Sequence, residues 1–159
     1  MGFLNNLING ISLGSIYAVI ALGYTLVYGI AKMLNFAHGD VIMIGGYVTY
    51  IAMSSLGLPA WVAVLLSVIV CTVLGILIEK VAYRPLREAA SSLAVLITAI
   101  GVSYFLQNVA LLLFGANTKS FTSVVGNASV QLAEGLSVTV VTIVTVIACV
   151  IIMIGLMAF

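Results

Sequence analysis

The sequence predicts an all-α fold: a polytopic transmembrane helical protein with about five spans in this chain. Of its 159 residues, 64% are hydrophobic and 6% are charged, against about 25% charged residues in an average soluble domain. The mean hydropathy is +1.37. Uncharged apolar tracts of about 20 residues recur along the chain, which is the length that a helix needs to cross the hydrocarbon core of a bilayer. We therefore expect a multi-pass protein that is surrounded by lipid.

Five apolar tracts mark the expected spans, at residues 7–30, 33–56, 60–78, 93–114 and 136–159. No Lys or Arg precedes the first tract, which also outruns the apolar core of a signal peptide, so we expect it to remain in the mature protein. A short link at Lys32, a turn at 57–59, a charged loop at 79–92 and a polar loop at 115–135 separate the tracts. The polar loop is rich in Gly, Ser, Thr and Asn, and is a candidate for a short hairpin.

The positive charges predict the topology. The loop at 79–92 holds Lys80, Arg84 and Arg87, and the positive-inside rule places it in the cytoplasm. Alternation then puts the N-terminus and the 115–135 loop outside and the end of the last span inside. Four of the five Lys and Arg residues fall on the cytoplasmic side, so the assignment is self-consistent.

Small residues recur at every third or fourth position of the first span and share one helical face: Gly10, Gly14, Ala18, Ala21, Thr25 and Gly29. Such a face lets another helix approach closely, so we expect helix packing there. A second side carries Tyr17, Tyr24 and Tyr28. Their hydroxyl groups either bond to neighbouring helices or line a wet path, and packing is the favoured interpretation.

The stretch "MLNFAHGDVIMIGGY", residues 33–47, contains the only histidine of the chain, His38, two positions before Asp40. If a helix starts after Gly39 with Asp40 as its N-cap, residues 41–56 rise about 24 Å, against roughly 30 Å of hydrocarbon core. One interpretation is that "LNFAHGD" supplies the missing depth as non-helical backbone inside protein, which makes Asn35, His38, Gly39 and Asp40 candidates for a translocation path. The other is a wet cytoplasmic turn whose polar side chains cap helix ends. The sequence leaves both open.

The fourth span carries a polar stripe, formed by Thr98, Gly101, Tyr104 and Asn108 with Gln107 beside it. Polar side chains in a span turn toward protein or water, so the stripe predicts a buried face. It serves either hydrogen bonding between helices or contact with a translocated solute. The fifth span, rich in Val, Ile and Thr, is expected to face lipid.

Several function classes find no support in the chain. It has no P-loop, no H-E-x-x-H and no G-x-S-x-G motif, and no acid pair placed for acid-base chemistry, so we do not expect an enzyme. One histidine and two isolated cysteines, Cys71 and Cys149, are too few for a metal site. A net charge of +1 gives no reason to expect nucleic acid as a partner. We expect no cofactor in this chain.

Longer motifs carry a resemblance. "GISLGSIYAVIALGYTLVYGI" (10–30), "LNFAHGD" (34–40), "AYRPLR" (82–87) and "LAVLITAIGVSYFLQN" (93–108) occur in the order found in the permease subunits of branched-chain amino-acid ABC importers, the LivH-like group, which the chain closely resembles. The resemblance implies an importer of leucine, isoleucine or valine in the inner membrane of a bacterium or archaeon. Its implied partners are a second permease subunit, two cytoplasmic ATPase subunits that hydrolyse ATP, and an extracytoplasmic amino-acid-binding protein.

The family motif maps onto residues 35–40 here, and the family pattern implies further spans beyond residue 159. Residues 1–159 are thus expected to be the N-terminal part of a permease domain. In this part, only the loop around Arg84 and Arg87 is expected to contact a cytoplasmic partner. Permeases for urea and short amides are very similar, so they are the alternative within the resemblance. A membrane scaffold that transports nothing is the alternative from another class, and a channel is disfavoured because no filter-like loop or ring-forming charge occurs.

Overall fold

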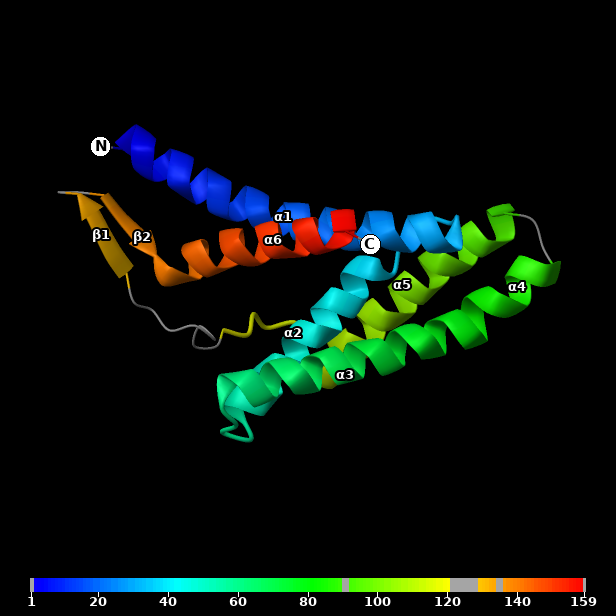
Figure 1. The fold of residues 1–159 in the computed structure, drawn as a ribbon. Coiled ribbons are helices and arrows are strands. Elements are labelled where there is room, and N and C mark those ends of the chain that lie inside the picture. The colour runs from blue at the N-terminus through cyan, green and yellow to red at the C-terminus, as the bar shows by residue number, and fades with distance from the viewer. Residues whose placement is uncertain (1, 90–91, 121–128, 134–135, 159) are drawn as a thin grey trace. The chain divides into compact units, whose positions relative to one another are not determined.

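The computed structural model describes residues 2–89, 92–120, 129–133 and 136–158, and these are mainly helical (Figure 1). In chain order the elements are α1 (Gly2–Ala31), α2 (His38–Ser54), α3 (Ala60–Ile78), the π-helical turn η1 (Glu79–Tyr83), α4 (Arg84–Ala89), α5 (Ser92–Phe114), the strands β1 (Ser129–Ala133) and β2 (Leu136–Thr139), and α6 (Val140–Ala158).

The predicted class, a polytopic helical membrane protein, is confirmed. In the described part of the chain, three helical runs are long and apolar enough to cross a membrane: Gly2–Ala31, Ala60–Leu86 and Leu93–Phe114. The helices at the second and fifth expected spans are shorter, since α2 has 17 residues and the apolar stretch of α6 is Val140–Gly155. The third expected span, 60–78, coincides with α3.

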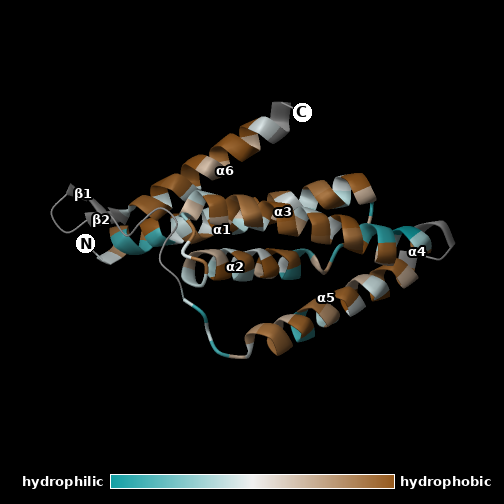
Figure 2. Cartoon of the chain, turned by 90° about the horizontal axis from the view of Figure 1, so that it is seen from below, coloured by the Kyte–Doolittle hydropathy of each residue, from teal (hydrophilic) through white to brown (hydrophobic). Residues whose placement is uncertain are grey.

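The charged segment at 79–92 was wrongly predicted as a loop. Most of it continues α3 without interruption through η1 and α4. Glu, Lys, Arg, Leu and Ala are good helix formers, and Pro85 follows the π-helical turn η1, a local irregularity of the kind found where a helix is distorted. Charge alone therefore does not end this helix. Figure 2 shows hydrophilic residues gathered around α4, whereas α3 and α5 are largely hydrophobic.

The fifth span begins later than predicted. Residues 136–139 are strand β2, which pairs antiparallel with β1 in the register Ser129 with Thr139 and Val130 with Val138, interrupted by an irregularity between Gln131 and Ala133. The hairpin expected in the 115–135 loop is thus present, but its second strand takes the first residues of the tract that was assigned to the span. β-branched residues pack well on a strand, so the apolar run at 136–139 fitted either element.

The chain divides into two compact units, residues 27–121 and residues 1–26 with 122–159. In the first unit, α2 packs against α3 and α5, and η1 packs against α5. The buried core of this unit consists of Ala37, Ile78, Tyr83, Ala99 and Leu106. Many apolar side chains point outward, such as Trp61, which is 67% exposed. Lipid can cover such side chains, as expected of a spanning helix.

The closest described approach between α2 and α3 is at Gly45. A Cβ atom built there would lie 2.9 Å from Cys71 Sγ and 3.0 Å from Ser67 Oγ. Ser67 Oγ donates a 2.9 Å hydrogen bond to the Gly45 carbonyl. Cys71 Sγ donates a 3.4 Å hydrogen bond to the Val41 carbonyl. The absent side chain therefore allows α3 to bond directly to the backbone of α2.

We predict that Gly45→Ala destabilises this pair of helices, because both neighbouring side chains must move from their hydrogen bonds. Overpacking of this kind costs about 1 to 3 kcal/mol. Gly46→Ala is the control, since a Cβ at Gly46 would meet nothing within 4 Å. Thermal unfolding of the purified full-length protein in detergent measures the effect. Equal melting temperatures for the two variants would contradict the predicted contact.

Candidate functional site: the helix break between α1 and α2

Residues 32–37, which we call the helix break, separate α1 from α2 and are not helical. Lys32 has a left-handed φ of 55°, and its N–H donates to the Tyr28 carbonyl at 2.8 Å, which closes the last turn of α1. α2 begins at His38, and Ala37 occupies its N-cap position without a side-chain hydrogen bond. A non-helical stretch is therefore present, but it covers residues 32–37 and not the predicted 34–40. His38, Gly39 and Asp40 belong to α2, so the prediction that Asp40 is the N-cap is wrong.

Asn35 organises the helix break and ties it to η1. Its side-chain Oδ1 accepts a 3.1 Å hydrogen bond from the Ala37 N–H, and its carbonyl accepts a 3.2 Å bond from the His38 N–H. The same Oδ1 accepts a 2.7 Å hydrogen bond from the Tyr83 hydroxyl group. Asn35 thus replaces the missing cap of α2, in the way that Asn side chains stabilise turns, and it also holds a residue 48 positions away.

Asp40 ties the first turn of α2 to α5. It is the third residue of α2 and is only 8% exposed. Its carboxyl oxygens accept hydrogen bonds from Ser103 Oγ at 2.5 Å and from Gln107 Nε2 at 3.1 Å, and Gln107 Nε2 also lies 3.2 Å from Ser103 Oγ. The sequence left two interpretations of this stretch open, a wet cytoplasmic turn and non-helical backbone inside protein. Asp40 does not fit the wet turn, because protein side chains surround its carboxyl group.

The other candidates of the 35–40 motif are less enclosed. His38 is half-buried and has an interaction partner, whereas Gly39 is exposed and a Cβ there would meet nothing within 4 Å. Ala37, between Asn35 and His38, is fully buried. The motif therefore directs Asn35 and Asp40 toward neighbouring helices and packs Ala37 in the core.

Three of the four residues of the polar stripe predicted on α5 are exposed and Thr98 is half-buried, so the expectation of a buried face is wrong for Gly101, Tyr104 and Asn108 in the described chain. Tyr104 is 63% exposed, and Asn108 is exposed as well. Asn108 Nδ2 donates to the Tyr104 carbonyl at 2.7 Å, and Thr98 Oγ1 donates to the Ala94 carbonyl at 2.9 Å, both within α5. A role for Thr98 and Asn108 in a translocation path stays a prediction.

The face of α5 that packs carries four buried or half-buried residues: Ala99, Ser103, Leu106 and Ala110. Sequence reasoning missed Ser103 and placed Gln107 only beside the stripe. Their separation of four residues was the available signal, because such pairs of polar side chains lie next to each other on a helix. Tyr83 was missed as well, since it lay in the segment taken for a loop.

The candidates on α1 are mostly exposed. Gly10, Gly14, Ala18 and Ala21 are all exposed, and a Cβ at Gly10 or Gly14 would meet nothing within 4 Å. Helix packing at these four positions stays a prediction.

Among the other candidates, Tyr17 is 63% exposed, and Tyr24 is half-buried and has an interaction partner. Their part in a path is likewise a prediction. Arg84 is exposed, and the side chain of Arg87 lies outside the described residues.

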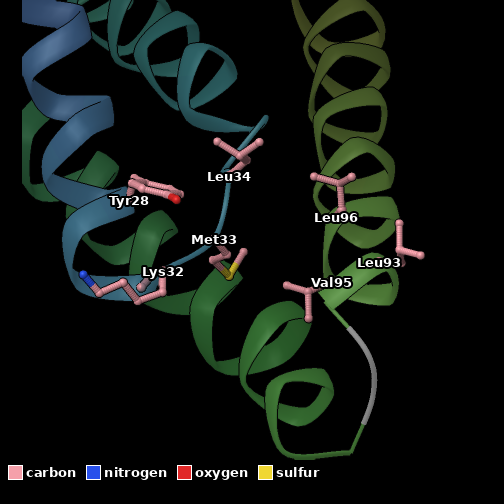
Figure 3. A pocket seen from close by; sticks show the side chains of 8 residues that line it. Tyr28, Lys32, Met33, Leu34, Leu93, Val95 and Leu96 are labelled. Carbon is pink, nitrogen blue, oxygen red and sulfur yellow. The ribbon is translucent and has the colours of Figure 1, made fainter.

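A recess of about 550 Å³ opens beside the helix break, between the end of α1 and the start of α5 (Figure 3). Figure 3 shows Leu34 and Leu96 facing each other across the opening, while the Lys32 side chain points away from it. The recess is mainly apolar. Within the described residues there is no group of three or more His, Cys, Asp or Glu side chains that could hold a metal ion.

The fold and the site define a class: a multi-pass helical membrane protein in which a non-helical stretch, held by hydrogen bonds of Asn35, precedes α2. Residues 6–159 match the family described as "Branched-chain amino acid transport system / permease component". The chain belongs to this family.

Three curated relatives show the degree of similarity. The permease protein BraD of a high-affinity branched-chain amino acid transport system from Pseudomonas aeruginosa is 49% identical over 69% of this chain and 38% of its own length. The LivH proteins of Salmonella typhimurium and Escherichia coli, named in the same way, are 42% and 46% identical over 91% and 67% of this chain. The chain spans 50% or less of the length of these relatives. No solved structure matches it.

We predict that Tyr83→Phe loosens the helix break, because it removes the hydroxyl donor to Asn35 and leaves the buried ring in place. The loss should be about 0.5 to 1.5 kcal/mol, the net contribution of one hydrogen bond. Tyr104→Phe is the control, since it removes an exposed hydroxyl group of α5. Denaturant unfolding in detergent compares the two. A Tyr83→Phe variant as stable as Tyr104→Phe would show that the hydrogen bond to Asn35 contributes nothing.

Proposed function

We propose that this chain belongs to the membrane-spanning permease subunit of an ATP-driven importer for leucine, isoleucine and valine. In this proposal it forms the translocation path together with a second permease subunit. Membership of the permease family and the names of the relatives support it. The single structural observation that carries it is the buried Asp40, whose carboxyl group accepts hydrogen bonds from Ser103 and Gln107 next to the helix break that Tyr83 holds through Asn35.

Non-helical backbone at membrane depth is tolerated only where protein or a water-filled cavity satisfies its polar groups. The break meets this requirement through Asn35, and its neighbour Asp40 is a buried acidic residue of the kind that marks solute and ion paths in membrane proteins. α2 alone rises only about 25 Å, so the break also contributes length to the second span. We assign it to the wall of the path.

The remaining parts of the proposal concern partners and orientation. ATP hydrolysis takes place on separate cytoplasmic subunits, and an extracytoplasmic binding protein delivers the amino acid. The N-terminus lies on the outer side of the inner membrane of a bacterial cell. The helix α4, which carries the exposed Arg84, lies in the cytoplasm. It is the candidate contact for the ATPase. The positive-inside rule supports this orientation.

Uptake of labelled leucine and labelled urea tests the function, in cells deleted for the gene and complemented with the whole reading frame. We expect selective loss of leucine uptake in the deletion strain and its return with the wild-type gene. If the deletion strain lost urea uptake alone, urea would take the place of leucine as the proposed solute. If it lost neither leucine uptake nor urea uptake, a membrane scaffold would be favoured.

We predict that Asp40→Ala fails to restore leucine uptake although the protein is still inserted, because Ser103 and Gln107 lose their acceptor. Immunoblots of the membrane fraction measure insertion. Thr72→Ala is the control: Thr72 is an exposed polar residue of α3 that bonds to the Val68 carbonyl of its own helix, and its loss should leave uptake unchanged. Normal uptake by Asp40→Ala would contradict the role of the network.

The orientation has its own test. A topology reporter fused after Arg87 should report the cytoplasm, and one fused after Ser120 should report the outside, because the charged segment follows the positive-inside rule. A periplasmic signal from the Arg87 fusion would reverse the side of the membrane assigned to every loop and terminus.

A further inference from the structure

A second cavity, of about 270 Å³, adjoins the helix break on the side of α3. The end of α1, the break, the first turn of α2, the end of α3 and η1 all contribute to its lining. Asn35 and Tyr83 line it, so the polar network described above forms part of its wall. The cavity is therefore built by the same contacts that hold the break in place.

The lining combines a large apolar surface with a few polar groups, which is typical of sites for small molecules. Val27, Val41 and Ile78 supply aliphatic surface from three different helices. Asn35, Tyr83 and Glu79 supply the polar groups. Glu79 is the one acidic residue among the described residues of the lining, and an acidic side chain attracts an ammonium group.

The volume suits a small amino acid. The cavity volume of about 270 Å³ lies just below the range of about 300 to 1,000 Å³ that is typical of sites for small molecules. The recess of Figure 3 shares Ala31 and Met33 with this cavity but measures about 550 Å³, and the described residues of its lining include no acidic residue. The smaller cavity is the better match in chemistry.

We propose that this cavity binds the transported solute, an amino acid with a branched aliphatic side chain. The aliphatic group lies against Val27, Val41 and Ile78, and the ammonium group lies toward Glu79. The inference rests on the proposed function and names the site at which that function is carried out. It also separates the rival solutes, because urea is polar on all sides and would leave the aliphatic wall without a partner.

Gly75 provides the test, since it lines the cavity and a Cβ there would meet nothing within 4 Å. Gly75→Ala should therefore narrow the cavity without a clash, and Gly75→Val should narrow it further. Gly101→Ala and Gly101→Val are matched controls: Gly101 is also an exposed helical glycine with open space around it, and it is not part of this lining. Each substitution changes the intrinsic helix propensity by the same amount at position 75 as at position 101.

The measurement is the KM of ATP-dependent uptake into proteoliposomes that hold the complete transporter, with leucine, isoleucine and valine as solutes. Removing the space of one methyl or methylene group in an apolar pocket changes discrimination by about 10-fold or more. We expect Gly75→Val to raise the KM for leucine and isoleucine about 10-fold, with a smaller rise for valine and for Gly75→Ala. The Gly101 variants should match the wild type.

Glu79→Gln supplies a second variant that leaves the cavity volume unchanged. It should raise the KM for all three amino acids, because each carries the ammonium group. If wild-type protein takes up leucine while the Gly75 variants match their Gly101 controls and Glu79→Gln matches the wild type, the cavity assignment is overturned and the proposed function stands. If wild-type protein takes up none of the three solutes, both are overturned.

Discussion

The hydrogen bonds that Asp40 accepts from α5 are the contacts on which the arrangement of residues 27–121 depends. A carboxyl group that is 8% exposed in an apolar surrounding is costly unless its oxygens are bonded, and Ser103 and Gln107 provide those bonds. The requirement fixes the position of the first turn of α2 on α5. Asn35 imposes a similar requirement on η1 through Tyr83, so the helix break is held at two points. With both held, the fully buried Ala37 packs in the core.

This arrangement connects the chemistry of the motif to the proposed transport. An unsupported break would expose backbone N–H and C=O groups, which lipid cannot satisfy. Here the side chain of Asn35 takes the place of the missing helical bonds, and the resulting bend leaves space beside Val41 and Ile78. The hydrogen bonds of Asn35 and Asp40 hold the break to η1 and α5, and they therefore give the cavity a defined shape. In our account, the break shapes the solute site rather than reacting with the solute.

Length and apolar periodicity were enough to predict most of the helices, because a spanning helix is set by a local property of the sequence. α3 was predicted with its observed bounds, whereas the break was predicted only approximately, because α2 begins at His38 and not after Gly39. The continuation through Glu79–Tyr83 was missed because charge was taken as a sign of a loop, although those residues form helices readily. The strand at 136–139 was missed because an apolar β-branched run fits a strand and a helix equally well.

The partners within the site were harder to predict than the site itself. Asp40 and Ser103 are 63 residues apart, and no local spacing connects them. The stripe on α5 misled for a physical reason: Thr98 and Asn108 satisfy their polar groups on carbonyls of their own helix, so their presence does not show which face is buried. A small polar residue flanked by buried alanines, as Ser103 is, was the better guide to the packed face.

The most direct test of this account is a double-mutant cycle on Asp40→Ala and Ser103→Ala, with the free energy of unfolding of the full-length protein in detergent as the measured quantity. If the two side chains stabilise the break through their mutual hydrogen bond, the double mutant loses less than the sum of the single losses, with a coupling of about 1 to 3 kcal/mol. Additivity within about 0.5 kcal/mol would contradict the account. In that case Asp40 would not hold α2 on α5.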